Sequence, residues 1–492
     1  MELLFCTLHF HHSTPGGNRS RAHSKSRSGT HGAAAAPGRS RIGVLGAALA
    51  LGLNFGAVCV APADAQTTLT AARGASTPLF LKAPPNTRCT LRTMSPHATP
   101  ALDGFSNSHG IVRYVITVRA DARSEALATL ECRNRATHTL TGFTIVPGKF
   151  AAPTPRAAAR RPLAIADLAT DARFGVLPGT PHGFDVTRAS DAQLVALGYP
   201  RRPDAHLSPQ AYLIWRKLVT TPGAYVDPGV VVTPRVHGPV RNLRRRAAHR
   251  SIFSGATTYG ATTPNWSGVV ATNTPAAFSD VVGQWSVPGV STNGNLGAGY
   301  SSAWVGIDGF GTGDVVQDGT ESDAFDDYFF SYASYYAWYE FYPDYAHALS
   351  NVPVSPGDSV FAISTTYVDN NGYVNGSYYF YDVSAGTGTV ASELIPAGAP
   401  YSGSSAEWIV ERPTVGGGLS PMPDYGSAQI SSTFAQTTDG DLFYADGSNS
   451  FGANDIMYDL LMTSDGTYNG DLLSDGYVQD ANDVDFLYFN WL

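Results

Sequence analysis

Short alternating segments separated by tight-turn dipeptides fill residues 251–492. This half is rich in Gly, Ser, Thr, Tyr and Asp, and its apolar and polar residues alternate as in half-buried strands. Helical periodicity is missing over any ten residues, apart from a candidate stretch at 455–461. The turn signals are Asn371-Gly372, Asp439-Gly440, Asp446-Gly447, Asp465-Gly466 and Asp475-Gly476. We therefore expect an all-β fold, a two-sheet antiparallel β-sandwich of the jelly-roll or concanavalin-like type.

Charge is divided between the two halves of the chain. Residues 1–251 hold 31 Lys+Arg and 12 Asp+Glu, a net charge of +19. Residues 252–492 hold 28 acidic residues and one basic residue, Arg412, a net charge of −27, and the two sum to −8. Crowded carboxylates repel one another and titrate at higher pH, so we expect this acidic body to be most stable in acid. With 11% aromatic and 15% charged residues, the chain is neither disordered nor a nucleic-acid-coating protein.

The acidic half lacks several side chains that catalysis commonly uses. All cysteines lie in the first third of the chain, at Cys6, Cys59, Cys89 and Cys132. Residues 252–492 have no lysine and one histidine, His347, which we expect at the surface near a turn. These counts exclude thiol nucleophiles, cysteine or multi-histidine metal sites and Schiff-base chemistry, and a Ser-His-Asp triad would have to use His347. Carboxylates, amides, hydroxyls or aromatic groups remain, and we expect no metal and no cofactor.

Residues 1–65 have the pattern of an export signal with a long basic lead-in. Basic residues end at Arg41, an apolar run follows from Ile42 to Val60, and Ala63-Asp64-Ala65 resembles a cleavage site. A membrane-spanning helix is the alternative interpretation, but glycines and Asn54 interrupt the run. We therefore expect a secreted protein, extracellular or periplasmic, without membrane attachment after signal removal.

Residues 66–150 alternate apolar and polar residues in short stretches, as at 111–118, which predicts a small β domain. Cys89 and Cys132 lie within it and are the natural disulfide pair of an exported protein. The domain contains no catalytic constellation.

Residues 151–250 are rich in Ala, Pro and Arg, with helical spacing of apolar residues at 190–197 and 209–218. The region ends in a basic run, Arg241 to Arg250. Such a run is ordinarily a solvated linker. Because it directly precedes a body of net charge −27, we favour a propeptide that docks electrostatically and that acid releases as the carboxylates protonate. We expect its cleavage between Arg246 and Gly255.

Four segments combine carboxylates, an amide and aromatic residues: 304–309, 315–319, 337–344 and 406–411. In a strand, residues two apart point to the same face. One face carries Trp304 and Asp308, then Trp338, Glu340 and Tyr342, then Glu407 and Ile409. Val305, Tyr339 and Trp408 represent the opposite, apolar face. The first face is a candidate substrate cleft, and the second is suited to a core between sheets.

These segments, in this order, resemble the glutamic peptidases, or eqolisins. The similar region also contains Asn265-Trp266-Ser267-Gly268 and Gly283-Gln284-Trp285-Ser286-Val287-Pro288, and it covers about residues 260–492. The resemblance implies a β-sandwich with two large antiparallel sheets and an endopeptidase active at acid pH. It implies protein or peptide substrates, no cofactor, and a catalytic Gln and Glu on the concave sheet.

By this resemblance, the catalytic glutamate is Glu407 in the string AEWIVE and the catalytic glutamine is Gln317 in VQDG. The spacing from Asp308 to Gln317 is one residue shorter than in fungal members, and Asp318 stands where a small residue is expected. The fungal disulfides are also absent. These departures concern loop geometry and subsites rather than the Glu/Gln pair.

Five further residues match positions at the site by the same resemblance. Trp304 and Asp308 match positions beside it, and Trp338, Glu340 and Tyr342 match positions that line the cleft. We expect these five to contact substrate, with a structural hydrogen-bond role as the alternative for Glu340 and a core position as the alternative for Trp304 and Trp338.

A Glu/Gln pair suits hydrolysis in acid. A carboxyl group with a pKa of about 4.3 can activate water and then protonate the leaving amine near pH 4. The amide of Gln317 can donate to the oxyanion without titrating, whereas a histidine base would be protonated. We therefore predict a secreted, monomeric acid endopeptidase, made as a zymogen that its own propeptide inhibits. Residues 252–492 lack DTG and DSG loops, so we expect insensitivity to pepstatin-type inhibitors.

A function of a different class remains open. A jelly-roll carbohydrate-binding module or glycoside hydrolase would use Glu340 and Glu407 as paired carboxylates and the tryptophans as sugar platforms. Gln317 distinguishes the two, because glycosidic cleavage does not need it.

Overall fold

The computed structural model describes residues 59–61, 67–73, 76–93, 101–118, 126–134, 137–150, 183–197, 199–220, 224–250, 257–272, 276–327, 330–368, 374–394, 401–448 and 456–489. All of them belong to one unit of the chain, Gly56–Leu492. Most of the expected export signal, residues 1–65, lies outside the described residues, and so does the 251–256 part of the expected cleavage zone. No helix in the described ranges is long and apolar enough to span a membrane.

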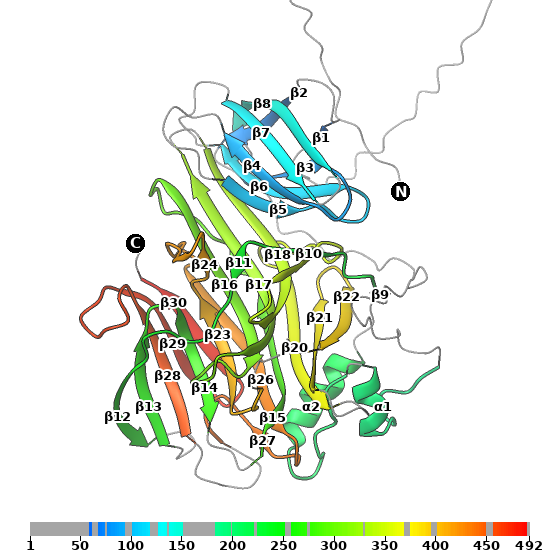
Figure 1. The fold of residues 1–492 in the computed structure, drawn as a ribbon, viewed down its shortest axis with the longest axis vertical. Coiled ribbons are helices and arrows are strands. Elements are labelled where there is room, and N and C mark those ends of the chain that lie inside the picture. Colours follow the sequence, from blue (N-terminus) through cyan, green and yellow to red (C-terminus); the bar gives the residue numbers. More distant parts are fainter. Residues whose placement is uncertain are drawn as a thin grey trace, which may run out of the picture. The chain divides into compact units, whose positions relative to one another are not determined.

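The first sheet contains the long strands that carry the four candidate segments (Figure 1). In spatial order its strands are β13 (Thr257–Thr263), β28 (Ile456–Thr463), β14 (Trp266–Thr272), β23 (Ser405–Glu411), β16 (Gly297–Ile307), β17 (Val315–Asp326), β18 (Phe330–Tyr342) and β19 (His347–Leu349). The candidate helix at 455–461 is wrong, since residues 456–461 belong to strand β28, which pairs with β13 and β14. An apolar run fits a buried helix or a buried strand, and here its neighbours decide.

The second sheet runs in the order β22 (Thr387–Leu394), β21 (Val374–Asp382), β20 (Ser359–Val368), β15 (Phe278–Ser286), β26 (Ser427–Thr437), β30 (Asp483–Tyr488) and β29 (Leu472–Asp480). A short strand, β27 (Leu442–Phe443), pairs with β26. Strand β29 also pairs with β28, so it joins the two sheets.

Alternate residues of both sheets point into a core between the layers. Val305 and Trp408 of the first sheet lie in one buried cluster with Trp285 and Phe380 of the second. Trp304, next to Val305 in sequence, belongs to a different buried cluster on the other face of the first sheet. The predicted β-sandwich is confirmed, and the two faces separate as strand alternation predicts.

Residues 67–150 fold into strands of their own, shown in blue to cyan in Figure 1. They are β2 (Thr67–Arg73), β3 (Ser76–Lys82), β4 (Arg88–Thr93), β5 (Ala101–Phe105), β6 (Ile111–Val118), β7 (Ala126–Arg133) and β8 (His138–Phe150), and β1 (Cys59–Ala61) pairs with β3. A disulfide joins Cys89 to Cys132, which are register partners in β4 and β7. Strand β6 also pairs with β18, so this domain continues the first sheet.

The two helices expected from apolar spacing are present as α1 (Asp191–Ala196) and α2 (Pro209–Val219) (Figure 1). Trp215 of α2 is fully buried in a cluster that includes Phe361 of β20 and Tyr379 of β21. These two residues alternate with core residues of the same strands, so the helices cover the outer face of the second sheet.

The chain then crosses the first sheet from one edge to the other. Its short strands are β9 (Ala224–Tyr225), β10 (Val230–Val232), β11 (Arg235–Val236) and β12 (Arg244–Arg250). Strand β10 pairs with β19 at one edge, and β12 pairs with β13 at the opposite edge. Between them, β11 forms a small sheet with β24 (Thr414–Val415) and β25 (Gly418–Leu419). Residues 233–243, named the crossing segment below, therefore span the face that carries Trp304.

Candidate active site

Gln317 and Glu407 lie on the two strands that flank β16. Gly306 of β16 is the register partner of Gln317 in β17 and of Glu407 in β23. Directly opposed residues point to the same face, so the side chains of Gln317 and Glu407 lie on either side of Gly306, which has no side chain. A Cβ at Gly306 would lie 2.8 Å from the Trp304 ring and 3.2 Å from Cβ of Gln317. Glycine therefore leaves room between two strands that are about 10 Å apart.

Rows of cross-strand partners extend this face along the strands. The first row is Glu340, Gln317, Gly306 and Glu407, the second is Trp338, Gly319, Trp304 and Ile409, and the third is Tyr336, Glu321, Ser302 and Glu411. The indole N–H of Trp304 donates to Oε2 of Glu411 at 2.9 Å. The predicted residues Trp304, Trp338 and Glu340 thus lie on one face with Gln317 and Glu407.

Burial changes the titration of the carboxyl groups on this face. Burial, only partly offset by the nearby Ser405 hydroxyl, raises the pKa of Glu407 well above its usual range. It also raises the pKa values of Glu340 and Glu321 to about 7. Neither carboxyl oxygen of Glu407 has a hydrogen-bond partner of good geometry among the described residues. A proton on Glu407 is therefore favoured while the face is covered.

His237 of the crossing segment occupies the centre of this face. The Gln317 side-chain amide donates to the main-chain carbonyl of His237. The main-chain N–H of His237 donates to Oε2 of Glu340 at 2.8 Å. Its ring nitrogens lie 3.1 Å from Glu340 Oε2 and 2.9 Å from Glu321 Oε2, and its ring stacks on Trp338 at 3.7 Å. A main-chain carbonyl of the protein itself therefore fills the position next to the Gln317 amide.

The residues after His237 continue along the face as an extended chain. A Cβ on Gly238 would lie 3.6 Å from the ring of Tyr342, which places this predicted residue beside the segment. The side-chain amide of Asn265 donates to the carbonyl of Pro239 at 3.3 Å, and the N–H of Val240 donates to the Gly309 carbonyl at 3.1 Å. Main-chain hydrogen bonds of this kind hold an extended peptide independently of its side chains.

Asp308 follows the end of β16 and turns away from the strand, with a φ of 69°. Its carboxylate accepts main-chain hydrogen bonds from Ser402, Gly403 and Ser404 at 2.8–2.9 Å. The hydroxyls of Ser402 and Ser404 also donate to it, both at 2.9 Å. This loop leads into β23, so Asp308 supports the strand that carries Glu407, and its acceptors are already used.

Sequence reasoning missed several charged residues of the site. Glu321 and Asp323 lie an even number of residues after Gln317 in the twelve-residue strand β17, so their side chains point to the same face as Gln317. This spacing could have located them. In the same way, Glu411 lies an even number of residues after Glu407 in β23, so both side chains point to one face. Arg235 and His237 had no such signal, because 88 and 84 residues, respectively, separate them from their partners in β17.

The basic run makes contacts other than those we expected. Arg245 lies over the ring of Tyr458 at 4.9 Å, and Arg246 lies over the ring of Tyr468 at 3.9 Å. The run also pairs with β13 as an edge strand. The strongest charge contacts of this region come instead from Arg235 and His237, which are buried on the face.

Two further residues differ from expectation. His347, expected at the surface, is buried in β19, where its ring stacks on Tyr339 at 4.9 Å. It is the register partner of Tyr339, and β10 covers its other side. Asp318 points away from the cleft face, and the hydroxyl of Ser364 donates to it at 2.7 Å. Burial raises the pKa of Asp318 well above its usual range.

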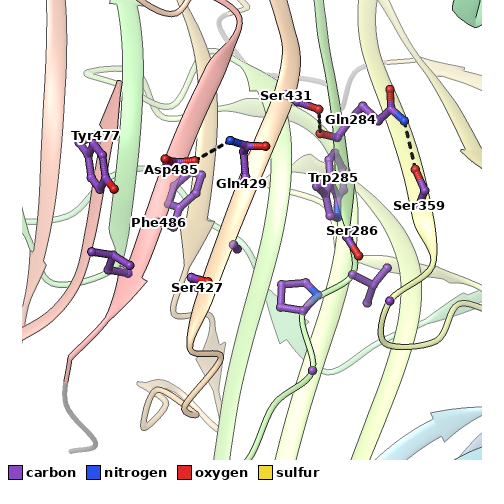
Figure 2. Close-up of a pocket in the computed structure, with 16 residues that line it drawn as sticks. Gln284, Trp285, Ser286, Ser359, Ser427, Gln429, Ser431, Tyr477, Asp485 and Phe486 are labelled. Atoms are coloured by element: carbon purple, nitrogen blue, oxygen red, sulfur yellow. Dashed lines mark hydrogen bonds between the residues drawn. The ribbon is translucent and has the colours of Figure 1, made fainter. Parts of the chain in front are cut away.

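A cavity of about 620 Å³ lies elsewhere, over β15, β26 and β30 (Figure 2). Gln284, Gln429 and Asp485 line it, and its polar groups bond to one another: Gln284 to Ser359 at 3.1 Å and Gln429 to Asp485 at 2.8 Å. Because the neighbouring Trp285 points into the core, the cavity is on the outer face of the second sheet, away from Gln317. In the described ranges, no group of His, Cys, Asp and Glu residues could hold a metal ion.

Residues 264–472 match the family model of the Peptidase A4 family. Aspergillopepsin-2 of Aspergillus niger is 28% identical over 231 residues, which are 44% of this chain and 77% of that protein. Scytalidopepsin B of Scytalidium lignicola is 34% identical over 108 residues, which are 22% of this chain and 37% of that protein.

Solved structures of similar chains are also known. Scytalido-glutamic peptidase with a transition state analog inhibitor is 22% identical, with a TM-score of 0.36, over 46% of this chain and 98% of that chain. Aspergilloglutamic peptidase from Aspergillus niger is 27% identical, with a TM-score of 0.29, over 39% of this chain and 99% of that chain. Through residues 264–472, this chain is therefore similar to the peptidases of the Peptidase A4 (eqolisin) family.

Proposed function

We propose that residues 251–492 form an acid endopeptidase that hydrolyses peptide bonds in proteins with a Glu/Gln pair. The observation that carries this proposal is the row in which Gln317 and Glu407 flank Gly306, with a main-chain carbonyl already bonded to the Gln317 amide. In catalysis, this amide stabilises the negative charge that develops on the substrate carbonyl oxygen. Glu407 activates the attacking water and then protonates the leaving amine.

The titration of Glu407 depends on whether its face is covered. Burial raises the pKa of Glu407 in the covered state. When the face opens to water, this penalty falls, and the pKa moves towards the ordinary value of about 4.3. The open enzyme then has a carboxylate base near pH 4, whereas the covered chain has a protonated acid. Activity in acid and latency in the covered state therefore follow from the same side chain.

The crossing segment makes the chain a latent precursor. His237 contacts Gln317, Glu340, Glu321 and Trp338, so a substrate cannot bind while it is in place. Activation requires the segment to leave, and cleavage between Arg246 and Gly255 would free it from the body. The signal-like pattern of residues 1–65 supports export of this precursor, and we propose that it acts outside the cell as a monomer. The match of residues 264–472 to a peptidase family supports proteolysis over the carbohydrate alternative.

The substitution Glu407→Gln in the full chain tests the proposal. It should abolish casein hydrolysis at about pH 4, because an amide can neither accept nor release the proton. Circular dichroism melts should match those of the wild type. The matched control is Asp485→Asn on the outer face of the second sheet, which should retain full activity. Casein cleavage by the folded Glu407→Gln variant would overturn the assignment, and stoichiometric inhibition by pepstatin would point to an aspartic mechanism.

A further inference from the structure

We propose that the amino-terminal β domain, residues 67–150, anchors the crossing segment, and that Asp103 is the residue that holds Arg235 in place. This role, which rests on the proposed function, gives the domain a regulatory task. In this role, the domain determines the pH at which the crossing segment leaves the cleft.

Arg235 is shared between the amino-terminal domain and the cleft. It is 1% exposed, and its Nη2 lies 2.7 Å from Oδ2 of Asp323 in β17. Its Nε lies 3.6 Å from Oε1 of Glu321 in the same strand, and its guanidinium lies 4.2 Å from the centre of the Tyr300 ring. The third carboxylate comes from the other domain, since Nη1 lies 3.1 Å from Oδ2 of Asp103 in β5. One buried cation therefore bridges two parts of the chain.

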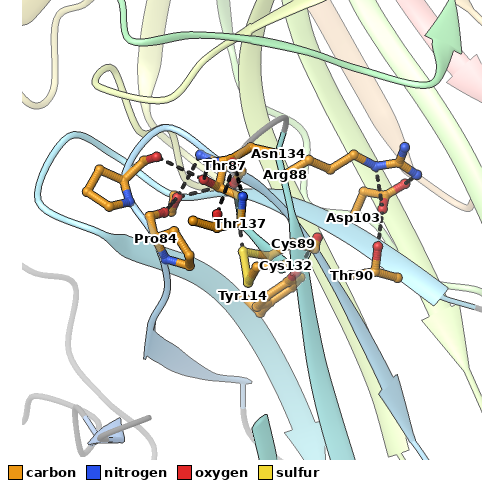
Figure 3. Close-up of a disulfide and its surroundings, with 12 residues drawn as sticks. Pro84, Thr87, Arg88, Cys89, Thr90, Asp103, Tyr114, Cys132, Asn134 and Thr137 are labelled. Carbon is orange, nitrogen blue, oxygen red and sulfur yellow. Dashed lines mark hydrogen bonds and ion pairs between the residues drawn. A yellow bond between two sulfur atoms is a disulfide. The ribbon is translucent and has the colours of Figure 1, made fainter. Parts of the chain in front are cut away.

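The amino-terminal domain positions Asp103 with its own strands (Figure 3). Arg88 donates to both carboxylate oxygens at 3.1 Å, and the hydroxyl of Thr90 donates to Oδ1 at 2.8 Å. These residues flank Cys89, whose disulfide to Cys132 links β4 to β7. The carboxylate is thus oriented before Arg235 arrives, which reduces the ordering that the ion pair requires.

The domain itself is fixed to the first sheet beside the cleft. Residues of β6 pair with the start of β18, with Phe330 opposite Val118. The hydroxyl of Ser334 in β18 donates to the main-chain carbonyl of Asp103 at 2.8 Å. Phe105 contacts the ring of Tyr336 edge-on at 4.8 Å. An anchor that is attached to the catalytic sheet can hold the segment against that sheet.

The titratable or charged groups that face Arg235 and Asp103 are Glu321 and Asp323 of β17, Tyr300 of β16, Tyr336 of β18, Tyr114 of β6, Arg88 of β4 and His237 of the crossing segment. Burial raises the pKa of Asp323 well above its usual range and that of Glu321 to about 7. A raised pKa in the covered state means that acid favours the covered state through these two groups. Their protonation therefore does not release the segment, contrary to our expectation from the sequence.

Asp103 and His237 work in the opposite direction. Burial raises the pKa of Asp103, but the charges of Arg235 and Arg88 outweigh burial and hold this pKa below its usual range. The stabilisation from Asp103 is therefore present above the ordinary carboxyl range and is lost as pH falls through the lowered pKa. Burial likewise lowers the pKa of His237, which Glu340 and Glu321 face, so its contribution is also lost as pH falls through its lowered pKa. Of these contacts, the pair of Asp103 with Arg235 is the one that joins the segment to the amino-terminal domain.

The experiment measures the rate of acid activation of the full chain between about pH 6 and pH 2.5. Asp103→Asn should activate about ten-fold faster than the wild type at pH 5, because it removes one partner of a buried ion pair. The two rates should converge as pH falls through the lowered pKa of Asp103, because the carboxyl group of the wild type then protonates as well. The matched control is Glu131→Gln, which removes a carboxylate that pairs with Arg133 and His138 in the same domain. It should follow the wild type at every pH.

Further variants separate the anchor from general destabilisation. Adding Asp103→Asn to Arg235→Met should give no further acceleration, because the pair is already broken. Equal rates for Asp103→Asn and the wild type at pH 5, or an equal gain at all pH values, would overturn the proposal. A readout without catalysis uses the Glu407→Gln chain, in which Asp103→Asn should speed hydrogen exchange at residues 235–240. If the wild type shows no proteolysis, the proposed function fails, whereas unchanged exchange would refute the anchor alone.

Discussion

Residues 183–250 cover the outer faces of both sheets, but the two contacts have opposite chemistry. On the first sheet, the crossing segment places His237 and Arg235 against buried carboxyl groups. On the second sheet, α2 places Trp215 against Phe361 and Tyr379. Ionisable contacts respond to pH, whereas an apolar contact does not titrate. The stability of the first cover therefore depends on pH, and the second is suited to hold the fold at any pH.

The largest expected effect is on catalysis at the first face. Gln317→Ala should lower kcat by about 100- to 1000-fold with little change in KM, because the lost donor acts mainly in the transition state. Its matched control is Gln284→Ala, which removes a glutamine from the outer face of the second sheet and should leave kcat unchanged. Steady-state kinetics of the acid-activated enzyme measure both. Similar losses in the two variants would break the distinction between the faces.

The second face should show the reverse pattern. Trp215→Ala should lower the free energy of unfolding of the full chain by about 3–5 kcal/mol, because it leaves a cavity under α2. Urea denaturation at pH 4 and pH 7 should give the same loss at both values. Leu213→Ala, on the same helix but 63% exposed, is the control and should change stability little. A loss that appeared at only one pH would mean that ionisable groups contribute to this contact as well.

The smallest expected effect is the pH dependence of stability. The pKa values of Glu321 and Glu340 are raised to about 7, so their stabilisation is complete below the unfolded value of about 4.5 and is lost as pH rises through about 7. The melting temperature of the Glu407→Gln chain should therefore fall over this range. Adding Glu321→Gln should flatten the slope, and adding Trp215→Ala should leave it unchanged. A melting temperature that peaked at pH 7 would contradict these assignments.

Much of the fold could be predicted because the relevant signals are local. Strand alternation separated Trp304 from Val305, since consecutive side chains in a strand point to opposite faces. Apolar spacing located α1 and α2, since residues three or four apart in a helix share one face. The prediction failed at residues 455–461, where a stretch too short to define a period resembled a helix and pairing with β13 and β14 decided the outcome.

Part of the candidate site could not be predicted, because its contacts join distant parts of the chain. Arg235 is 132 residues from Asp103 and 88 from Asp323, and the partners of His237 in β17 and β18 lie 84 and 103 residues away. A basic residue in a Pro-rich region gives no indication of which carboxylate it meets. The division of charge suggested attraction between the halves, but it pointed to the basic run rather than to Arg235 and His237.

The amino-acid sequence alone limited the chemistry available in residues 252–492 to carboxyl, amide, hydroxyl and aromatic groups, on strands with one polar and one apolar face. It did so because composition and strand period are properties of the chain before it folds. The tertiary structure decided which carboxyl groups are buried, which of them share Arg235, and that His237 lies against Gln317. Burial and proximity set the direction in which each group titrates, and neither exists until the sheets, the crossing segment and the amino-terminal domain pack together.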